Sequence, residues 1–213
     1  MLRYLLLIPM MLTWGAQASA VDKGNNATPI LRRLTDCVVA ADKAGAVALL
    51  NTYPYSDGER RQAAALITAK GACGRAQGRV PTFHLRGSIA ESLYRQKFAQ
   101  APVSGEVPVV MPSEADWESR ASVVKRNQLA ACLTSADVIA VDTLVRSVSG
   151  SNDEADSYTS LQPALNNCAQ KIGSMEIHAE MLRAALAESI YRLALIKANE
   201  PLPERPWPPV ARN

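Results

Sequence analysis

The sequence predicts an all-α protein made of two tandem pseudo-repeats of about four helices each, with one disulfide inside each repeat. The segment LRGSIAESLYR at 85–95 returns as LRAALAESIYR at 182–192, with seven of eleven positions identical. Such internal similarity at a long spacing is typical of a repeated structural unit. Apolar residues recur at helical spacing, and no run of alternating β-branched residues is convincing as a strand. The four cysteines form two pairs with the same separation of 36 residues: Cys37 with Cys73, and Cys132 with Cys168.

Residues 1–20 are predicted to be a secretory signal peptide. Arg3 supplies a positive start, residues 4–14 form an apolar run, and Ala18 and Ala20 complete an A-x-A cleavage site. We therefore expect an exported, most simply periplasmic, protein that is cleaved after Ala20. The apolar run is too short to span a bilayer, and no transmembrane helix is expected in the mature chain. A retained membrane anchor is the alternative.

The charge balance and the cysteines restrict the partners and the chemistry. Without Arg3 the chain has 22 basic and 20 acidic residues, a balance that does not indicate a nucleic-acid partner. In an oxidising compartment cysteines pair, and the repeat selects Cys37–Cys73 and Cys132–Cys168 among three possible pairings. Each bridge closes a loop and should thereby stabilise the folded chain by about 3.5–4 kcal/mol in the chain-entropy model. A metal site is the competing hypothesis, but the chain has no CxxC pair and only two histidines.

The first repeat, residues 21–98, is expected to contain four helices. Thr28 and the proline that follows it suit the start of the first helix. Asp42 caps a short second helix, and Ser56 with Glu59 forms a capping box before the third. The fourth helix is expected to start at Thr82 and to include the repeated segment.

The second repeat, residues 113–198, follows the same plan. Ser113 is expected to cap a long first helix, Asp137 a short second helix, and a capping box at 151–154 the third. Pro163 is expected to kink or split that third helix, because proline lacks the backbone N–H of a helix interior. The last helix is expected to start at Ser174.

Proline-containing segments mark the boundaries. Residues 99–112 contain three prolines and are expected to form the linker between the repeats, and residues 199–213 contain five and form a tail. The tail is either a partner-binding polyproline strand that presents Trp207 or a segment that packs back or frays, and we favour the second.

Catalytic signatures are weak in this sequence. Ser122 and Lys125 match an S-x-x-K pattern, but its companion motifs are missing, so a surface pair is the better interpretation. His84 and His178 do not coincide under the repeat, and each is more simply a solvated or hydrogen-bonded residue than a base or a ligand. We therefore predict no enzyme, no catalytic or metal site and no cofactor.

The repeated helix carries the remaining candidate site. One hypothesis is a pseudo-symmetric groove between the repeats for a ligand or a protein; the other, which we favour, is that this helix is the central packing element of each repeat. Glu91 with Arg95 and Glu188 with Arg192 are i,i+4 pairs in the favourable order. The candidate groove residues are Arg86, Glu91, Tyr94, Arg95, Arg183, Glu188, Tyr191 and Arg192.

The chain resembles small exported helical proteins of unknown function from Gram-negative bacteria. The resemblance depends on the export signal, the 36-residue cysteine spacing and the LRxxxAESxYR helix, and it covers most of residues 30–195. It implies no assigned activity. We expect a non-catalytic protein of the cell envelope that binds another protein or acts as a scaffold; the alternative is a small-molecule-binding protein with its ligand between the repeats.

Overall fold

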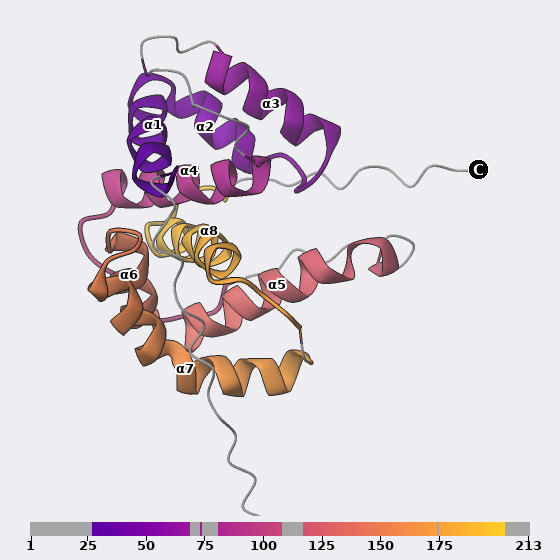
Figure 1. Cartoon of the computed structure of the whole chain (residues 1–213), viewed down its shortest axis with the longest axis vertical. Coiled ribbons are helices and arrows are strands. Elements are labelled where there is room, and N and C mark those ends of the chain that lie inside the picture. Colours follow the sequence, from indigo (N-terminus) through magenta and orange to yellow (C-terminus); the bar gives the residue numbers. More distant parts are fainter. Residues whose placement is uncertain (1–26, 69–72, 74–80, 108–116, 174, 203–213) are drawn as a thin grey trace, which may run out of the picture.

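The computed structural model describes residues 27–68, 73, 81–107, 117–173 and 175–202, and the described part contains eight helices and no strand (Figure 1). The all-α prediction is therefore confirmed. The helices are α1 (Ala27–Ala41), α2 (Lys43–Leu50), α3 (Asp57–Thr68), α4 (Thr82–Lys97), α5 (Trp117–Ala136), α6 (Val138–Arg146), α7 (Asn152–Ile172) and α8 (Ala179–Lys197).

The predicted caps form at equivalent places in the two halves of the chain. The Asp42 carboxylate accepts a hydrogen bond from Gly45 N (2.8 Å) at the start of α2, and Asp137 does the same for α6. The Ser56 hydroxyl accepts from Glu59 N (3.1 Å), and the Ser151 hydroxyl accepts from Glu154 N (3.2 Å). These bonds satisfy backbone donors that a helix start leaves without an intrahelical partner.

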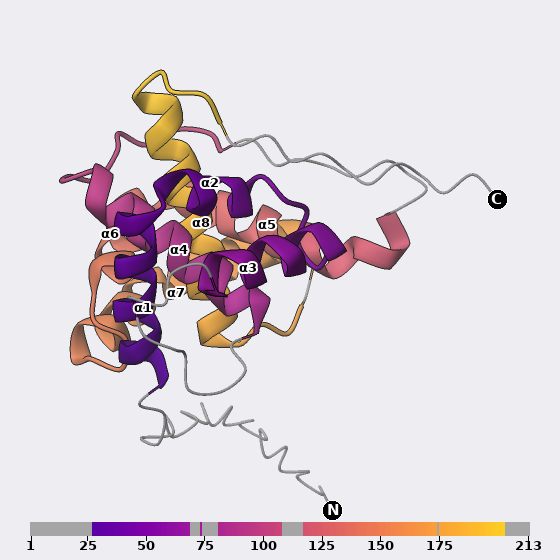
Figure 2. The ribbon, with the colours of Figure 1, turned by 90° about the horizontal axis from the view of Figure 1, so that it is seen from above.

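Helices α4 and α8 lie side by side in the middle of the molecule, and their contact is the most extensive between any two helices (Figures 1 and 2). Helices α1 to α3 lie on one side of this pair and α5 to α7 on the other (Figure 1). Buried residues of both halves belong to one hydrophobic core. The apolar stripes expected on the repeated helix are part of it: Leu85, Ile89 and Leu93 on α4, and Leu182, Leu186 and Ile190 on α8.

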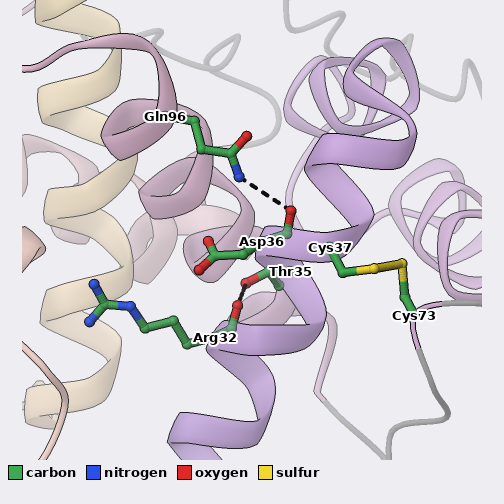
Figure 3. Close-up of a disulfide and its surroundings, with 6 residues drawn as sticks. All are labelled: Arg32, Thr35, Asp36, Cys37, Cys73 and Gln96. Atoms are coloured by element: carbon green, nitrogen blue, oxygen red, sulfur yellow. Dashed lines mark hydrogen bonds between the residues drawn. A yellow bond between two sulfur atoms is a disulfide. The ribbon is translucent and has the colours of Figure 1, made fainter.

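Both predicted disulfides form. Cys37 and Cys73 have Cα atoms 5.6 Å apart, and Cys132 and Cys168 have Cα atoms 5.9 Å apart, both usual for a disulfide. The first bridge ties α1 to the chain beyond α3, next to a point where Gln96 of α4 donates a hydrogen bond to the carbonyl of Asp36 (Figure 3). Each bridge therefore links residues within one half of the structure.

Two helix boundaries differ from the predictions. Helix α7 runs unbroken through Pro163, so the expected split is wrong. The removed N–H costs one intrahelical bond, and the packing of Leu161 and Cys168 in the core holds the helix on both sides of it. Helix α8 begins at Ala179 rather than at Ser174. Met175 and Ile177, two positions apart, both pack against the core, which an extended segment allows and a helix does not.

Several predicted features fall outside the described residues: the signal peptide at 1–20, the Ser113 cap, part of the linker at 99–112 and most of the tail at 199–213. Residues 99–107 carry no helix, and Leu202 packs against the core. Within the described ranges, no single helix has the length and hydropathy of a membrane span. Residues 121–136 and 138–146 reach that length and hydropathy only when taken together, and a bend of 110° separates them.

Candidate functional site

The structure brings the eight candidate residues to the contact between α4 and α8, which we call the seam. Six of them are buried there, and Arg95 and Glu188 are half-buried. The side chains are therefore packed against one another and against the helices around them. The space that the groove hypothesis requires is filled by the residues expected to line it, and the preferred hypothesis of a central packing helix agrees better with their burial.

The two halves exchange carboxylates across the seam. Arg86 Nε of α4 lies 3.0 Å from Glu188 Oε2 of α8, and Arg183 Nε of α8 lies 3.1 Å from Glu91 Oε2 of α4. Each arginine thus pairs with the glutamate of the other repeated segment. Hydrogen bonds to charged partners in a buried setting are stronger than neutral ones, so the exchange ties the two halves together.

Each buried arginine also closes the end of the short helix in its own half. Arg86 donates to the carbonyls of Leu49 (2.8 Å) and Leu50 (2.6 Å) at the end of α2. Arg183 donates to the carbonyl of Val145 (3.2 Å) at the end of α6. The last carbonyls of a helix have no intrahelical donors and form the negative end of its dipole, so a cation there is favourable.

The glutamates of the two capping boxes, Glu59 and Glu154, also bind the seam arginines Arg86 and Arg183. Glu59 accepts from Arg86 Nη1 at 3.4 Å and from the backbone N–H of Tyr55 at 2.7 Å. Glu154 accepts from Arg183 Nη1 at 2.8 Å and from the backbone N–H of Gly150. The capping box predicted from sequence is therefore connected through an arginine to the seam, a link that spacing along one helix does not reveal.

Gly87 and Ala184 occupy equivalent positions, one residue after the two arginines, and touch each other. A Cβ placed on Gly87 would lie 2.6 Å from the Cα of Ala184, closer than any ordinary contact. A small residue on each helix therefore lets the backbones of α4 and α8 approach closely. This approach places each arginine within reach of the glutamate opposite.

The electrostatics of the seam favour fixed charge states at neutral pH. Burial lowers the pKa of Arg86 to about 10, against the opposing effect of Glu59. Burial also lowers the pKa of Arg183, but the carboxylates of Glu91 and Glu154 outweigh it, so the pKa ends above its ordinary value. Burial and then the bond to Asp142 raise the pKa of Tyr94. These three groups hold structure together and are not set to exchange protons near neutrality.

Arg95 and Arg192 are equivalent in sequence but not in surroundings. Arg95 Nη2 lies 2.7 Å from Asp36 Oδ1, on α1. The position equivalent to Asp36 is Ala131, and Arg192 is buried with 6% of its surface exposed. Among the described residues, the Nε atoms of both arginines lack a hydrogen-bond acceptor, but Arg95 forms ion pairs with Asp36 and Glu91 and Arg192 forms none. Burial, and then repulsion from Arg86, lowers the pKa of Arg192.

Other contacts between the halves were not predicted from sequence. The Tyr94 hydroxyl donates to the Asp142 carboxylate on α6, which also accepts from Arg146 Nε at 2.7 Å. Arg126 of α5 lies over the ring of Phe83, 4.4 Å from its centroid, and donates to the Tyr55 hydroxyl at 3.1 Å. Arg126 has no charged counterpart in the repeat pattern, so no sequence signal marked it.

The other sequence candidates are not brought together. His84 Nδ1 lies 3.9 Å from Glu180 Oε2, and His178 stands exposed before α8. Ser122 is exposed and Lys125 is half-buried on α5. In the part of the chain that the structure describes, no group of three or more histidine, cysteine or acidic side chains is arranged to hold a metal ion.

Among the described residues, hollows also lie away from the seam. One, of about 480 Å³, lies beside Cys132 between α5 and the end of α7. The larger, of about 680 Å³, is open to solvent between α6 and α7, and we call it the α6–α7 hollow. Four carboxylates and one exposed apolar side chain are among its lining residues: Asp137, Asp142, Asp153, Asp156 and Ile139.

Comparison of the chain with protein-family models, with curated proteins and with solved structures gave no match. The functional argument below is therefore built on the geometry of this chain.

Proposed function

We propose that this protein is an exported, non-catalytic helical protein of the cell envelope that binds another protein or supports an assembly. The observation that carries the proposal is the α6–α7 hollow, which is open, acidic and bordered by Ile139 with 63% of its surface exposed. Protein contacts combine an apolar centre with a polar rim, whereas sites for small molecules are usually concave, enclosed and largely apolar.

Export is supported by the cysteines and by the first twenty residues. All four cysteines are disulfide-bonded, and such bonds form and persist mainly in oxidising compartments. The positive start, the apolar run and the A-x-A site at 1–20 have the order of a signal peptide. We propose the periplasm as the compartment, in keeping with the resemblance to small exported proteins of Gram-negative bacteria.

A non-catalytic role is supported by the contacts of the charged side chains that the two repeated segments share. Arg86, Glu91 and their counterparts Arg183 and Glu188 all make helix-to-helix or helix-end contacts. A small-molecule site between the repeats has less support, because these side chains fill the seam themselves. The exposed surface is the better place for a partner.

Site-specific photo-crosslinking in living cells tests the proposal. Ile139→p-benzoylphenylalanine places the reactive group at the α6–α7 hollow, and Gln170→p-benzoylphenylalanine, at an exposed position near the end of α7, is the matched control. We expect Ile139 to form adducts with another protein molecule, either a different envelope protein or a second copy of this chain, that Gln170 does not form. Identical adducts from both positions, or none from Ile139, would contradict a binding role for this surface.

A further inference from the structure

We infer that the protein also associates with a second copy of itself, head to tail, through the exposed face of α3 in one molecule and the α6–α7 hollow in the next. The inference rests on the protein-binding surface proposed above and names an occupant for it. Three observations carry it: opposite charges at equivalent positions of α3 and α7, the placement of these helices at opposite ends of the molecule, and the unequal charge of the two halves.

The acidic side of the contact is the start of α7. Asp153 and Asp156 are exposed and line the α6–α7 hollow. Among the described residues, neither carboxylate has an ion-pair partner, whereas Asp142 in the same hollow is bound by Arg146 and Tyr94. Two carboxylates are therefore available to a cation from outside the molecule.

The basic side of the contact is the equivalent helix of the first half. Arg61 stands 95 positions before Asp156 and is exposed on α3. Its guanidinium has no ion-pair partner among the described residues, while the neighbouring Arg60 pairs with Asp57. Ala64 and Ala65, also exposed on α3, are small enough to let the exposed Ile139 of another copy approach. With Asp57 and Arg60 paired to each other, the exposed unpaired charge on α3 is therefore the positive charge of Arg61, and the equivalent position on α7 is the negative Asp156.

The two faces cannot meet inside one molecule. Helices α4 and α8 separate α3 from α7, which lie at opposite ends of the structure (Figure 1). A second copy can bring its α3 to the hollow of the first. Because the two faces are different, such a contact is heterologous, and it leaves one α3 and one hollow free for further copies.

The charge distribution favours the same orientation. Residues 21–98 contain twelve basic and six acidic residues, and residues 99–213 contain ten basic and fourteen acidic residues. The small net charge of the whole chain therefore conceals a positive half and a negative half. Halves of opposite net charge attract each other between copies, and salt should weaken the contact because Arg61, Asp153 and Asp156 are exposed.

Exchange of the two charges tests the inference. The full chain, expressed with its own N-terminal segment and purified from an oxidising compartment, is compared by sedimentation velocity with R61D, D156R and the double variant R61D/D156R. The matched control is Glu176→Arg, a charge reversal at an exposed residue between α7 and α8. Circular dichroism confirms that each variant is folded.

We expect the natural chain to associate with increasing concentration at low salt and to dissociate at high salt. Each single variant should raise the dissociation constant about tenfold or more, because like charges then face each other. The double variant restores opposite charges and should recover the association, as should an equimolar mixture of R61D and D156R. E176R should behave like the natural chain.

A natural chain that stays monomeric at low salt would overturn the inference. So would a D156R variant that associates as E176R does, or a double variant as weak as the singles. The crosslinking experiment separates the two proposals. Adducts with a different protein and none with a second copy leave the proposed function standing and remove this inference, whereas the absence of any adduct from Ile139 removes both.

Discussion

At the scale of single residues, Arg86 and Arg183 have two tasks. Each closes the carbonyl end of a short helix in its own half, and each binds a glutamate of the other half. The sequence predicts the i,i+4 pairs within each helix, and the Glu91–Arg95 pair is present at 3.6 Å. It does not reveal the exchange between halves, because spacing along one helix carries no information about which helix lies opposite.

Removal of one partner of the Arg183–Glu91 pair should destabilise the fold strongly, because both side chains are buried. We expect Arg183→Met to lower the free energy of unfolding by about 3–5 kcal/mol, since it leaves the Glu91 carboxylate buried with one partner fewer. Arg183→Met combined with Glu91→Gln should cost less than the sum of the two single changes. Urea unfolding of the four proteins in this cycle measures the coupling, and additive losses would contradict a direct pair.

The buried Arg192 should be a weak point of the fold. Its Nε has no acceptor among the described residues, and the equivalent of the Asp36 carboxylate is Ala131. We expect Arg192→Met to raise the free energy of unfolding by about 1 kcal/mol or more, because an apolar side chain of similar length removes an uncompensated buried charge. Arg95→Met, which loses the ion pair with Asp36, is the matched control and should not stabilise. A lower melting temperature for R192M would show that Arg192 is compensated.

At the scale of elements, helices were predicted well where caps and apolar spacing agree and less well where tertiary packing decides. The caps at Asp42, Asp137 and Ser151 lie where the sequence predicts them. Pro163 predicts a kink or a split in α7, and the split is absent because packing on both sides keeps the helix continuous. The start of α8 was predicted too early, because Met175 and Ile177 reach the core from an extended segment.

The close approach of α4 and α8 should depend on Gly87. In an isolated helix Gly87→Ala would stabilise by about 1 kcal/mol. Here the added methyl group meets Ala184, so we expect a net loss of about 1–3 kcal/mol from overpacking. Ala184→Gly in the G87A background should restore only part of the stability, because it removes the Cβ of residue 184 but leaves its Cα 2.6 Å from the added methyl group; thermal unfolding can measure this. If G87A is as stable as the natural chain, the helices do not depend on the small residue.

At the scale of the whole molecule, the two halves share one core and one network of ion pairs. The sequence predicts two similar units and their disulfides, and the structure shows each unit completed by charges of the other. We therefore expect a single cooperative unfolding transition rather than two. Coincident unfolding curves from fluorescence and from circular dichroism would agree with this expectation; two separate steps would not.

Alkaline pH should loosen the whole molecule at its seam. Burial raises the pKa of both Tyr94 and Tyr191 above the ordinary value of 10.0. Below pH 10 both tyrosines are neutral in the folded and the unfolded chain. Above it the unfolded chain loses these protons first, so the contribution of each tyrosine to the free energy of unfolding should fall by up to about 1.4 kcal/mol per pH unit. The lowered pKa of Arg86 acts in the opposite direction, so the tyrosine contribution is measured as a difference between variants.

Tyr94→Phe provides the control for this pH dependence, because it removes one phenol of raised pKa while keeping the ring; the phenols of Tyr158 and Tyr191, whose pKa is also raised, remain. Urea unfolding at a series of pH values should show a shallower alkaline decline for Y94F than for the natural chain. An equal decline in the two proteins would assign the effect to other groups.

The exchange of carboxylates also constrains how the two repeated segments can vary. A change at Arg86 leaves Glu188 in the other segment with a lost partner, and a change at Arg183 does the same to Glu91. Each segment thus provides part of the environment in which the other folds. A substitution in one segment must therefore be compatible with the side chains of both. Positions outside this exchange, such as Asp36 and Ala131, face no such joint requirement and differ. Mutual dependence of this kind would preserve the identity of residues 85–95 and 182–192, which match at seven of eleven positions.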